Sequence, residues 1–216
     1  MFLELRNYFL NLIYKEKCLV CGCSKTNNLL CKTCQKDVHY LSSFAQRIYK
    51  EIPIYSMSFY KGSIKKLIQL LKFSHKKTSA KVLSSLLFQY FLSLNLNKDF
   101  IIIYPPSYFL KSASRGYNHM NLVAKYFSNL TGFKINTNLI KKIKATKSQY
   151  EAKNRHLNIK DSFKINLKEL KKIKDKNILL IDDITTSGAT LEEIINCFLN
   201  ENFKNITCLT ISKAGN

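Results

Sequence analysis

The sequence contains no apolar run approaching the about 20 residues of a membrane-spanning helix, so we expect no transmembrane segment. Its first residues, 1–8, include an acidic side chain, and no small-residue cleavage site follows them, so we expect no secretory signal. A GxGxxG turn and a Gly-Lys-Ser/Thr phosphate loop are both missing. The chain therefore offers neither a dinucleotide-binding turn nor a Walker A loop.

Acidic residues are scarce: 14 Asp and Glu face 35 Lys and Arg, a formal net charge of +21. Such a charge suggests a polyanionic partner such as nucleic acid, or attraction to an anionic membrane surface. The alternative is a compositional bias in which many lysines are simply solvated. A hydrophobic content of 46% excludes disorder, and 216 residues can bury one good core plus a small appendage.

Seven cysteines are present, and four of them form two CxxC pairs, which are Cys18 with Cys21 and Cys31 with Cys34. Four thiolates at this spacing can surround one ion, and they select zinc in a closed structural site. Cys23 could replace Cys21, and redox-active or free core cysteines are the alternatives. The module is too small to fold on its own apolar content, so the metal would supply much of its folding energy. Whether this module binds nucleic acid or only docks on a domain stays open.

Hydrophobic periodicity predicts alternating strands and helices after a short amino-terminal helix over residues 2–14. Pro53 marks a boundary, so we expect a metal module over residues 1–50 and a second domain over 51–216. Strand–helix alternation indicates an α/β fold, with a mainly parallel sheet and helices on both faces. We expect helices over 35–50, 61–94, 122–127 and 168–176, and strands over 52–60, 100–104, 178–181 and 206–212.

The densest basic stretch of the first half lies where the two expected helices of 61–94 meet. Phe73 could stack on a base there, as aromatic residues of single-strand binders do. The alternative is a solvated charged face with Phe73 in the core. The candidate nucleic-acid contacts are Lys65, Lys66, Lys72, Phe73, Lys76 and Lys77.

The most informative stretch runs from Asn177 to Glu193: an apolar strand, two acids, a small hydroxyl-rich loop and a helix start. Free main-chain N–H groups at such a helix start bind anions, and Gly188 allows close approach of a ligand. Two carboxylates beside a phosphate cradle make sense if the ligand also carries sugar hydroxyls or a divalent cation. A phosphorylated ribose would satisfy both the anion-binding loop and the two carboxylates. The alternative is an ordinary strand–helix unit in which these polar residues only cap the helix.

This stretch closely resembles the phosphoribosyl-diphosphate (PRPP) signature of type I phosphoribosyltransferases. The resemblance implies that Asp182 and Asp183 hold the ribose hydroxyls and are the catalytic residues. It further implies that the loop holds the 5′-phosphate, through Thr186, Ser187, Gly188, Ala189 and Thr190. Magnesium would bridge pyrophosphate and ribose oxygens, because phosphates and two Asp need a hard cation between them.

We expect the residues that bind the pyrophosphate group of PRPP in the turn that follows strand 100–104 and in two further segments. A Pro-rich turn can hold N–H groups toward a ligand, and in the family the corresponding turn receives pyrophosphate. Arg115 is placed to meet the pyrophosphate oxygens bidentately. The segment around residues 147–155 resembles the one that forms a flap over PRPP in type I enzymes, which implies that Lys147 and Arg155 could close on the diphosphate while the flap excludes water. An exposed polar connector is the alternative for that flap. The candidate residues are Pro105, Pro106, Ser107, Arg115, Lys147 and Arg155.

The order of motifs along the chain resembles the ComF family, phosphoribosyltransferase-like proteins associated with DNA uptake in natural competence. The four-Cys module, the Pro turn, Arg115-Gly-Tyr-Asn118, the Gln149–Asn158 segment and the PRPP motif carry the resemblance. The family usually has Phe and Gln where this chain has Tyr117 and His119.

The resemblance implies a cytoplasmic, PRPP- and Mg²⁺-binding competence protein with structural Zn²⁺ and single-stranded DNA as a partner. The DNA-uptake machinery at the inner face of the membrane is a further implied partner. The alternative is an active phosphoribosyltransferase that transfers phosphoribose to a nitrogen acceptor, which the sequence does not identify.

Overall fold

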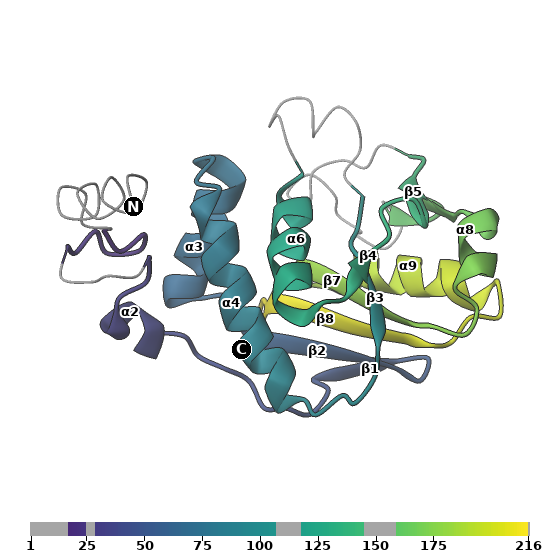
Figure 1. The fold of residues 1–216 in the computed structure, drawn as a ribbon, viewed down its shortest axis with the longest axis horizontal. Coiled ribbons are helices and arrows are strands. Elements are labelled where there is room, and N and C mark those ends of the chain that lie inside the picture. The colour runs from purple at the N-terminus through teal and green to yellow at the C-terminus, as the bar shows by residue number, and fades with distance from the viewer. Residues whose placement is uncertain (1–16, 25–28, 107–117, 145–158, 216) are drawn as a thin grey trace, which may run out of the picture.

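A computed structural model describes residues 17–24, 29–106, 118–144 and 159–215. Its centre is a six-stranded sheet in the order β1-β2-β8-β7-β3-β4 (Figure 1). β1 pairs antiparallel with β2, and the other neighbours pair in parallel, so the expected mainly parallel sheet is confirmed. The strands are β1 (Arg47–Tyr49), β2 (Ile52–Phe59), β3 (Phe100–Ile103), β4 (Lys134–Ile135), β7 (Asn177–Thr185) and β8 (Ile206–Lys213).

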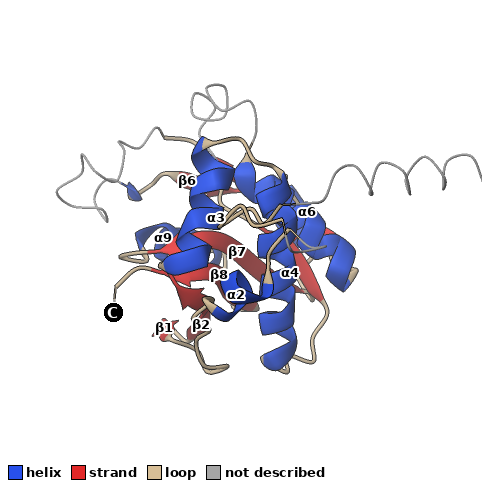
Figure 2. Ribbon diagram, turned by 90° about the vertical axis from the view of Figure 1, so that its left-hand side faces the viewer, coloured by secondary structure: helices blue, strands red, loops and turns tan. Residues whose placement is uncertain are grey.

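Helices cover both faces of this sheet, as Figure 2 shows, because each face carries its own set of buried apolar side chains. One face packs against α3 (Gly62–Phe73), α4 (Thr78–Ser93) and α6 (His119–Thr131). The other packs against α8 (Leu167–Lys172), α9 (Ala189–Leu199) and the antiparallel pair β5 (Ile140–Lys142) and β6 (Phe163–Ile165). The expected α/β architecture with two covered faces is confirmed.

The helix expected over residues 35–50 is wrong. A short helix, α2 (Lys32–Lys36), is followed by extended chain and then by β1. The backbone of this segment bonds to β2 instead of to itself: the Leu41 amide donates to the Met57 carbonyl, and the Gln46 amide donates to the Ile54 carbonyl. Long-range strand pairing therefore overrides local helix propensity here.

The cysteine module packs on the main domain. Cys18, Cys31 and Cys34 belong to the same buried cluster as α3 and α4, and Figure 1 shows the module beside these helices. Strand β1 lies before the expected boundary at residue 51, yet it is part of the central sheet. The helix expected over 2–14 lies outside the described residues. In the part of the chain that the structure describes, no helix is long and apolar enough to cross a membrane.

Candidate phosphoribosyl-diphosphate site

The carboxyl ends of β3 and β7 lie side by side, because the two strands pair in parallel with Ile103 opposite Leu180. Ligands of open α/β sheets bind at this edge. β7 extends further than the sequence indicated: its pairing with β8 continues to Thr185 opposite Lys213. Both acids therefore lie within the strand, near its end, instead of after it.

Asp183 is a buried carboxylate that contacts two basic side chains from different helices. Its Oδ2 atom lies 2.6 Å from Lys72 Nζ of α3 and 2.5 Å from His119 Nε2 of α6. Burial opposes ionisation, but the charge of Lys72 and the hydrogen bond and charge of His119 outweigh it. The pKa of Asp183 is consequently held below its ordinary range, and this carboxylate is charged at neutral pH.

Asp182 points to the opposite face of the sheet, since successive strand side chains alternate. There it lies near Lys142 of β5 and near the buried thiol of Cys208. Burial and the negative charge of Asp183 raise the pKa of Asp182 to about 7. The two adjacent acids thus differ in charge state, and a ligand that engages both must lie at the strand end between the two faces.

The loop after β7 is held by a residue that the sequence did not single out. Arg47 of β1 donates from Nη1 to the Ser187 carbonyl at 2.8 Å and forms a close ion pair with the buried Glu192 of α9. Gly188, the N-cap residue of α9, has φ +84, and a Cβ atom there would collide with Arg47. The positive φ at this point favours glycine, and an added Cβ atom would also displace the tip of the Arg47 side chain.

The remaining loop groups are consistent with a ligand at this edge. Thr186, Ser187 and Thr190 are partly exposed, and the Ser187 hydroxyl lies 3.4 Å from the Ala189 amide. The hydroxyl of Thr185 is buried, and no hydrogen-bond partner for it occurs among the described residues. Pro105 and Pro106 are partly exposed just after β3. Ser107, Arg115, Lys147 and Arg155 lie outside the described residues.

The four predicted metal ligands, Cys18, Cys21, Cys31 and Cys34, come together, with all four Sγ atoms within 4.8 Å of one another. The Cys31 amide approaches Cys18 Sγ, and the Cys34 amide approaches Cys31 Sγ, both at 3.5 Å. Such N–H groups pointing at sulfur are typical of thiolate sites. Cys23 is not a member of the group, which favours Cys21 as the ligand.

The electrostatics of the cluster favour thiolates at two positions. Burial of Cys18 favours the neutral thiol, but main-chain N–H groups of Cys21, Cys31 and Val20 lower its pKa to about 6. Hydrogen bonding from Cys34 lowers the pKa of Cys31 as well. Thiolates are the metal-binding form of cysteine, so the donor set fits a soft divalent ion.

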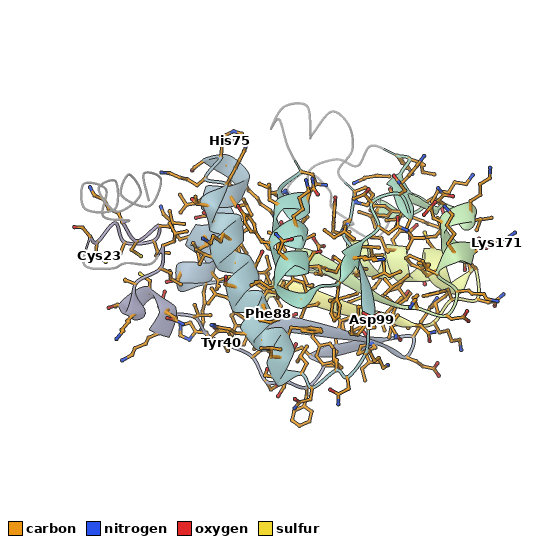
Figure 3. All side chains as sticks on the ribbon, in the orientation of Figure 1. Cys23, Tyr40, His75, Phe88, Asp99 and Lys171 are labelled. Atoms are coloured by element: carbon orange, nitrogen blue, oxygen red, sulfur yellow. The ribbon has the colours of Figure 1, made fainter. Side chains whose placement is uncertain are left out.

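The basic stretch at the end of α3 separates into two groups. Lys65, Lys66, Lys76 and Lys77 are exposed, and Phe73 is 66% exposed, so the alternative of a core phenylalanine is wrong. Lys72 differs from the exposed cation that the sequence suggested, because its side chain is only 19% exposed and lies against Asp183. Figure 3 labels His75 in the turn after α3, which Lys76 and Lys77 follow in the sequence.

Residues 75–215 match the family model of the phosphoribosyl transferase domain, and the chain belongs to this family. Similar proteins are competence protein F of Haemophilus influenzae, 26% identical over 196 residues, and DNA utilization protein YhgH of Escherichia coli K12, 24% identical over 193 residues. These matches cover 85% of each chain for the first, and 84% of this chain and 83% of the relative for the second. The resemblance to the ComF family is thereby confirmed.

Proposed function

We propose that this chain is a PRPP-binding protein of natural competence that also contacts single-stranded DNA. The observation that carries the proposal is the carboxyl end of β7, which carries the buried Asp183 and leads directly into the Gly188 loop at the start of α9. The similarity to competence protein F and to YhgH supports a role in the uptake or use of DNA. Its place of action would be the cytoplasm, next to the uptake machinery.

The proposed pose assigns each part of PRPP to a part of this edge. The 5′-phosphate would accept hydrogen bonds from the N–H groups of residues 186–190, because a helix start favours negative charge. The ribose hydroxyls would donate to Asp182 and Asp183, and the diphosphate would lie toward Pro105 and Pro106. Carboxylate oxygens are ligands that Mg²⁺ prefers, so the acids would also hold the ion that PRPP brings.

Calorimetry with PRPP and Mg²⁺ tests this site. We expect binding by the wild-type chain and loss of binding in Asp182→Ala/Asp183→Ala. The double variant Asp99→Ala/Asp175→Ala removes two exposed carboxylates away from the carboxyl end of β7 and is the control, which should keep the affinity of the wild type. Unchanged binding in the Asp182/Asp183 variant would refute the proposed site.

An active phosphoribosyltransferase is the second candidate, favoured by the intact acid pair and loop. The reaction would break the bond between ribose C1 and pyrophosphate, pass through an oxocarbenium-like centre, and form a C1–N bond to the acceptor. Pyrophosphate would leave with the bonding electrons, and the acceptor nitrogen would release its proton to solvent. A screen of nucleobases and amines for pyrophosphate release would establish this activity, and no release with any acceptor would favour a binding role.

A transformation assay connects the site to the proposed role in competence. A strain with a clean deletion should lose transformation, and the Asp182→Ala/Asp183→Ala and Cys31→Ser genes should each fail to restore it. Normal transformation in the deletion strain would end the competence proposal, whatever the result with PRPP.

A further inference from the structure

We propose that α3 places Lys72 in the PRPP site as a ligand-binding residue, and that Asp37 of the cysteine module determines where α3 lies. This inference rests on the proposed function. It adds a cation from outside the recognised motifs, and it connects two parts of the chain that the sequence presents as separate modules.

The contact at the carboxyl end of α3 is the first observation. Lys72 Nζ lies 2.6 Å from Asp183 Oδ2, and the two side chains are 19% and 10% exposed. An ammonium group has three hydrogens, so Lys72 can keep Asp183 and still donate to an oxygen of a bound phosphate. In a partly buried site this attraction is stronger than on the surface, because screening by water is reduced.

The contact at the amino end of α3 is the second observation, and it is independent of the first. Asp37, the C-cap residue of α2, accepts from the Ser63 amide at 2.7 Å and from the Ser63 hydroxyl at 2.8 Å. The N-cap position of α3, Lys61, makes no side-chain cap of its own. Asp37 therefore caps α3 from another element, and these bonds hold the pKa of Asp37 below its ordinary value.

The geometry around Asp37 is specific to this arrangement. A Cβ atom at position 62 would collide with the Asp37 carboxylate, and Gly62 has φ +51. α2 itself begins directly after Cys31, its N-cap residue, and contains Cys34. The folded cysteine module thus fixes Asp37, and Asp37 fixes the start of a 12-residue helix whose last turn carries Lys72.

α3 can transmit a change of position from its first turn to its last because its inner face is buried. A helix of this length spans about 18 Å. Its inner side chains, Ile64, Leu67, Ile68 and Leu71, are almost fully buried in the core that α3 shares with α4 and one face of the sheet, so α3 is held in place along its length. A shift at its start would therefore move Lys72 relative to Asp183.

The affinity for PRPP with Mg²⁺, measured by calorimetry on the full chain, tests the ligand-binding role. We expect Lys72→Met to lower the affinity at least tenfold, because a phosphate oxygen loses a partly buried cation. Lys76→Met, an exposed cation four residues further on, is the matched control and should bind as the wild type does. Lys72→Arg keeps the charge, and its PRPP affinity should stay within about threefold of the wild type. It serves as a folded comparison if urea unfolding shows that Lys72→Met is less stable.

The role of Asp37 is tested by a double-mutant cycle. Asp37→Ala should lower the PRPP affinity about threefold with an unchanged metal content. Asp37→Ala/Lys72→Met should bind no more weakly than Lys72→Met alone, because Asp37 acts through Lys72. Additive losses would overturn the connection through α3.

The outcomes separate this inference from the proposed function. If the wild-type chain binds no PRPP, the proposed function fails. If the wild type binds and Lys72→Met binds equally well, the PRPP site stands and the role of Lys72 is refuted.

Discussion

Asp182 and Asp183 are adjacent in the chain, but they lie in different electrostatic environments. Asp183 faces Lys72 and His119, which stabilise its charge. Asp182 lies on the other face, where burial and Asp183 raise its pKa to about 7. The pair thus carries between one and two negative charges near neutral pH, and a ligand that brings Mg²⁺ would favour full ionisation of Asp182.

The raised pKa of Asp182 predicts a pH-dependent cost to folding. Between about pH 4 and 7 the folded chain binds the proton more tightly than the unfolded chain, so the stability falls as pH rises through this window. The penalty is complete above about pH 7. Asp182→Asn cannot ionise and should gain roughly 1–2 kcal/mol over the wild type at pH 8, with little gain at pH 4. Urea unfolding at both pH values measures this difference, and a gain independent of pH would contradict it.

Gly188 offers a second prediction at the residue scale. Gly188→Ala introduces a Cβ atom where Arg47 lies and also strains a positive φ. Gly132, the C-cap residue of α6, has φ +77 with open space around it, so Gly132→Ala carries the strain alone. Backbone strain should cost each variant about 1 kcal/mol of stability. Gly188→Ala should lose more than this, because it also displaces Arg47, and it should weaken PRPP binding. Equal thermal shifts in the two variants would argue against the close approach of Arg47.

Among the elements, the cysteine module is held in two ways. The thiols of Cys18, Cys21, Cys31 and Cys34 cluster together, and the apolar residues of the module join the core of α3 and α4. The amide of Leu19 also donates to the Leu29 carbonyl, which joins the two halves of the module. A metal ion at the cysteines would therefore stabilise one end of the main domain as well as the module.

The zinc content of cysteine variants distinguishes the four proposed ligands from the neighbouring Cys23. Freshly purified, reduced protein should carry about one zinc per chain, and Cys31→Ser should lose most of it because three thiolates leave the site open. Cys23→Ser is the matched control, since Cys23 lies outside the group, and it should keep its zinc. Zinc analysis decides the matter, and a zinc-free wild type would exclude the site.

For the whole molecule, the excess of positive charge is the dominant feature. Four exposed lysines lie near the two ends of α3: Lys65 and Lys66 in the helix, and Lys76 and Lys77 after it; Phe73, its last residue, is exposed as well. α8 carries three further exposed lysines, Lys168, Lys171 and Lys172, and Figure 3 labels Lys171 at the other end of the molecule. Of these two groups, the one around α3 combines basic side chains with an aromatic ring that could stack on a base.

The salt dependence of single-stranded DNA binding tests this surface. Affinity should fall steeply with salt, and Lys76→Gln/Lys77→Gln should reduce the log–log slope by about 0.7 for each phosphate that the variant no longer neutralises. Lys171→Gln/Lys174→Gln makes the same change in net charge on α8 and its following turn and should leave the slope nearly unchanged. Equal effects of the two double variants would show that net charge alone attracts the DNA.

The sequence by itself determined the fold class and the members of both candidate sites that lie in local motifs. The apolar run before Asp182, the small loop and the helix start are consecutive, and the CxxC spacing restricts which thiols can meet. Local patterns of this kind suffice because the residues that act together are close in the chain. The Pro turn after β3 is distant in the chain, and it could be placed for a different reason: parallel strands end at one edge of the sheet.

Only the tertiary structure decided which distant side chains reach these motifs. Lys72 is 111 residues from Asp183, and Arg47 is 145 residues from Glu192, so no periodicity links them. The tertiary structure also placed the two acids on opposite faces, because β8 extends β7 by pairing with it as far as Thr185. Hydrogen bonds and ion pairs act through space, and it is the packing of α3 and β1 on the sheet that brings these cations to the PRPP motif.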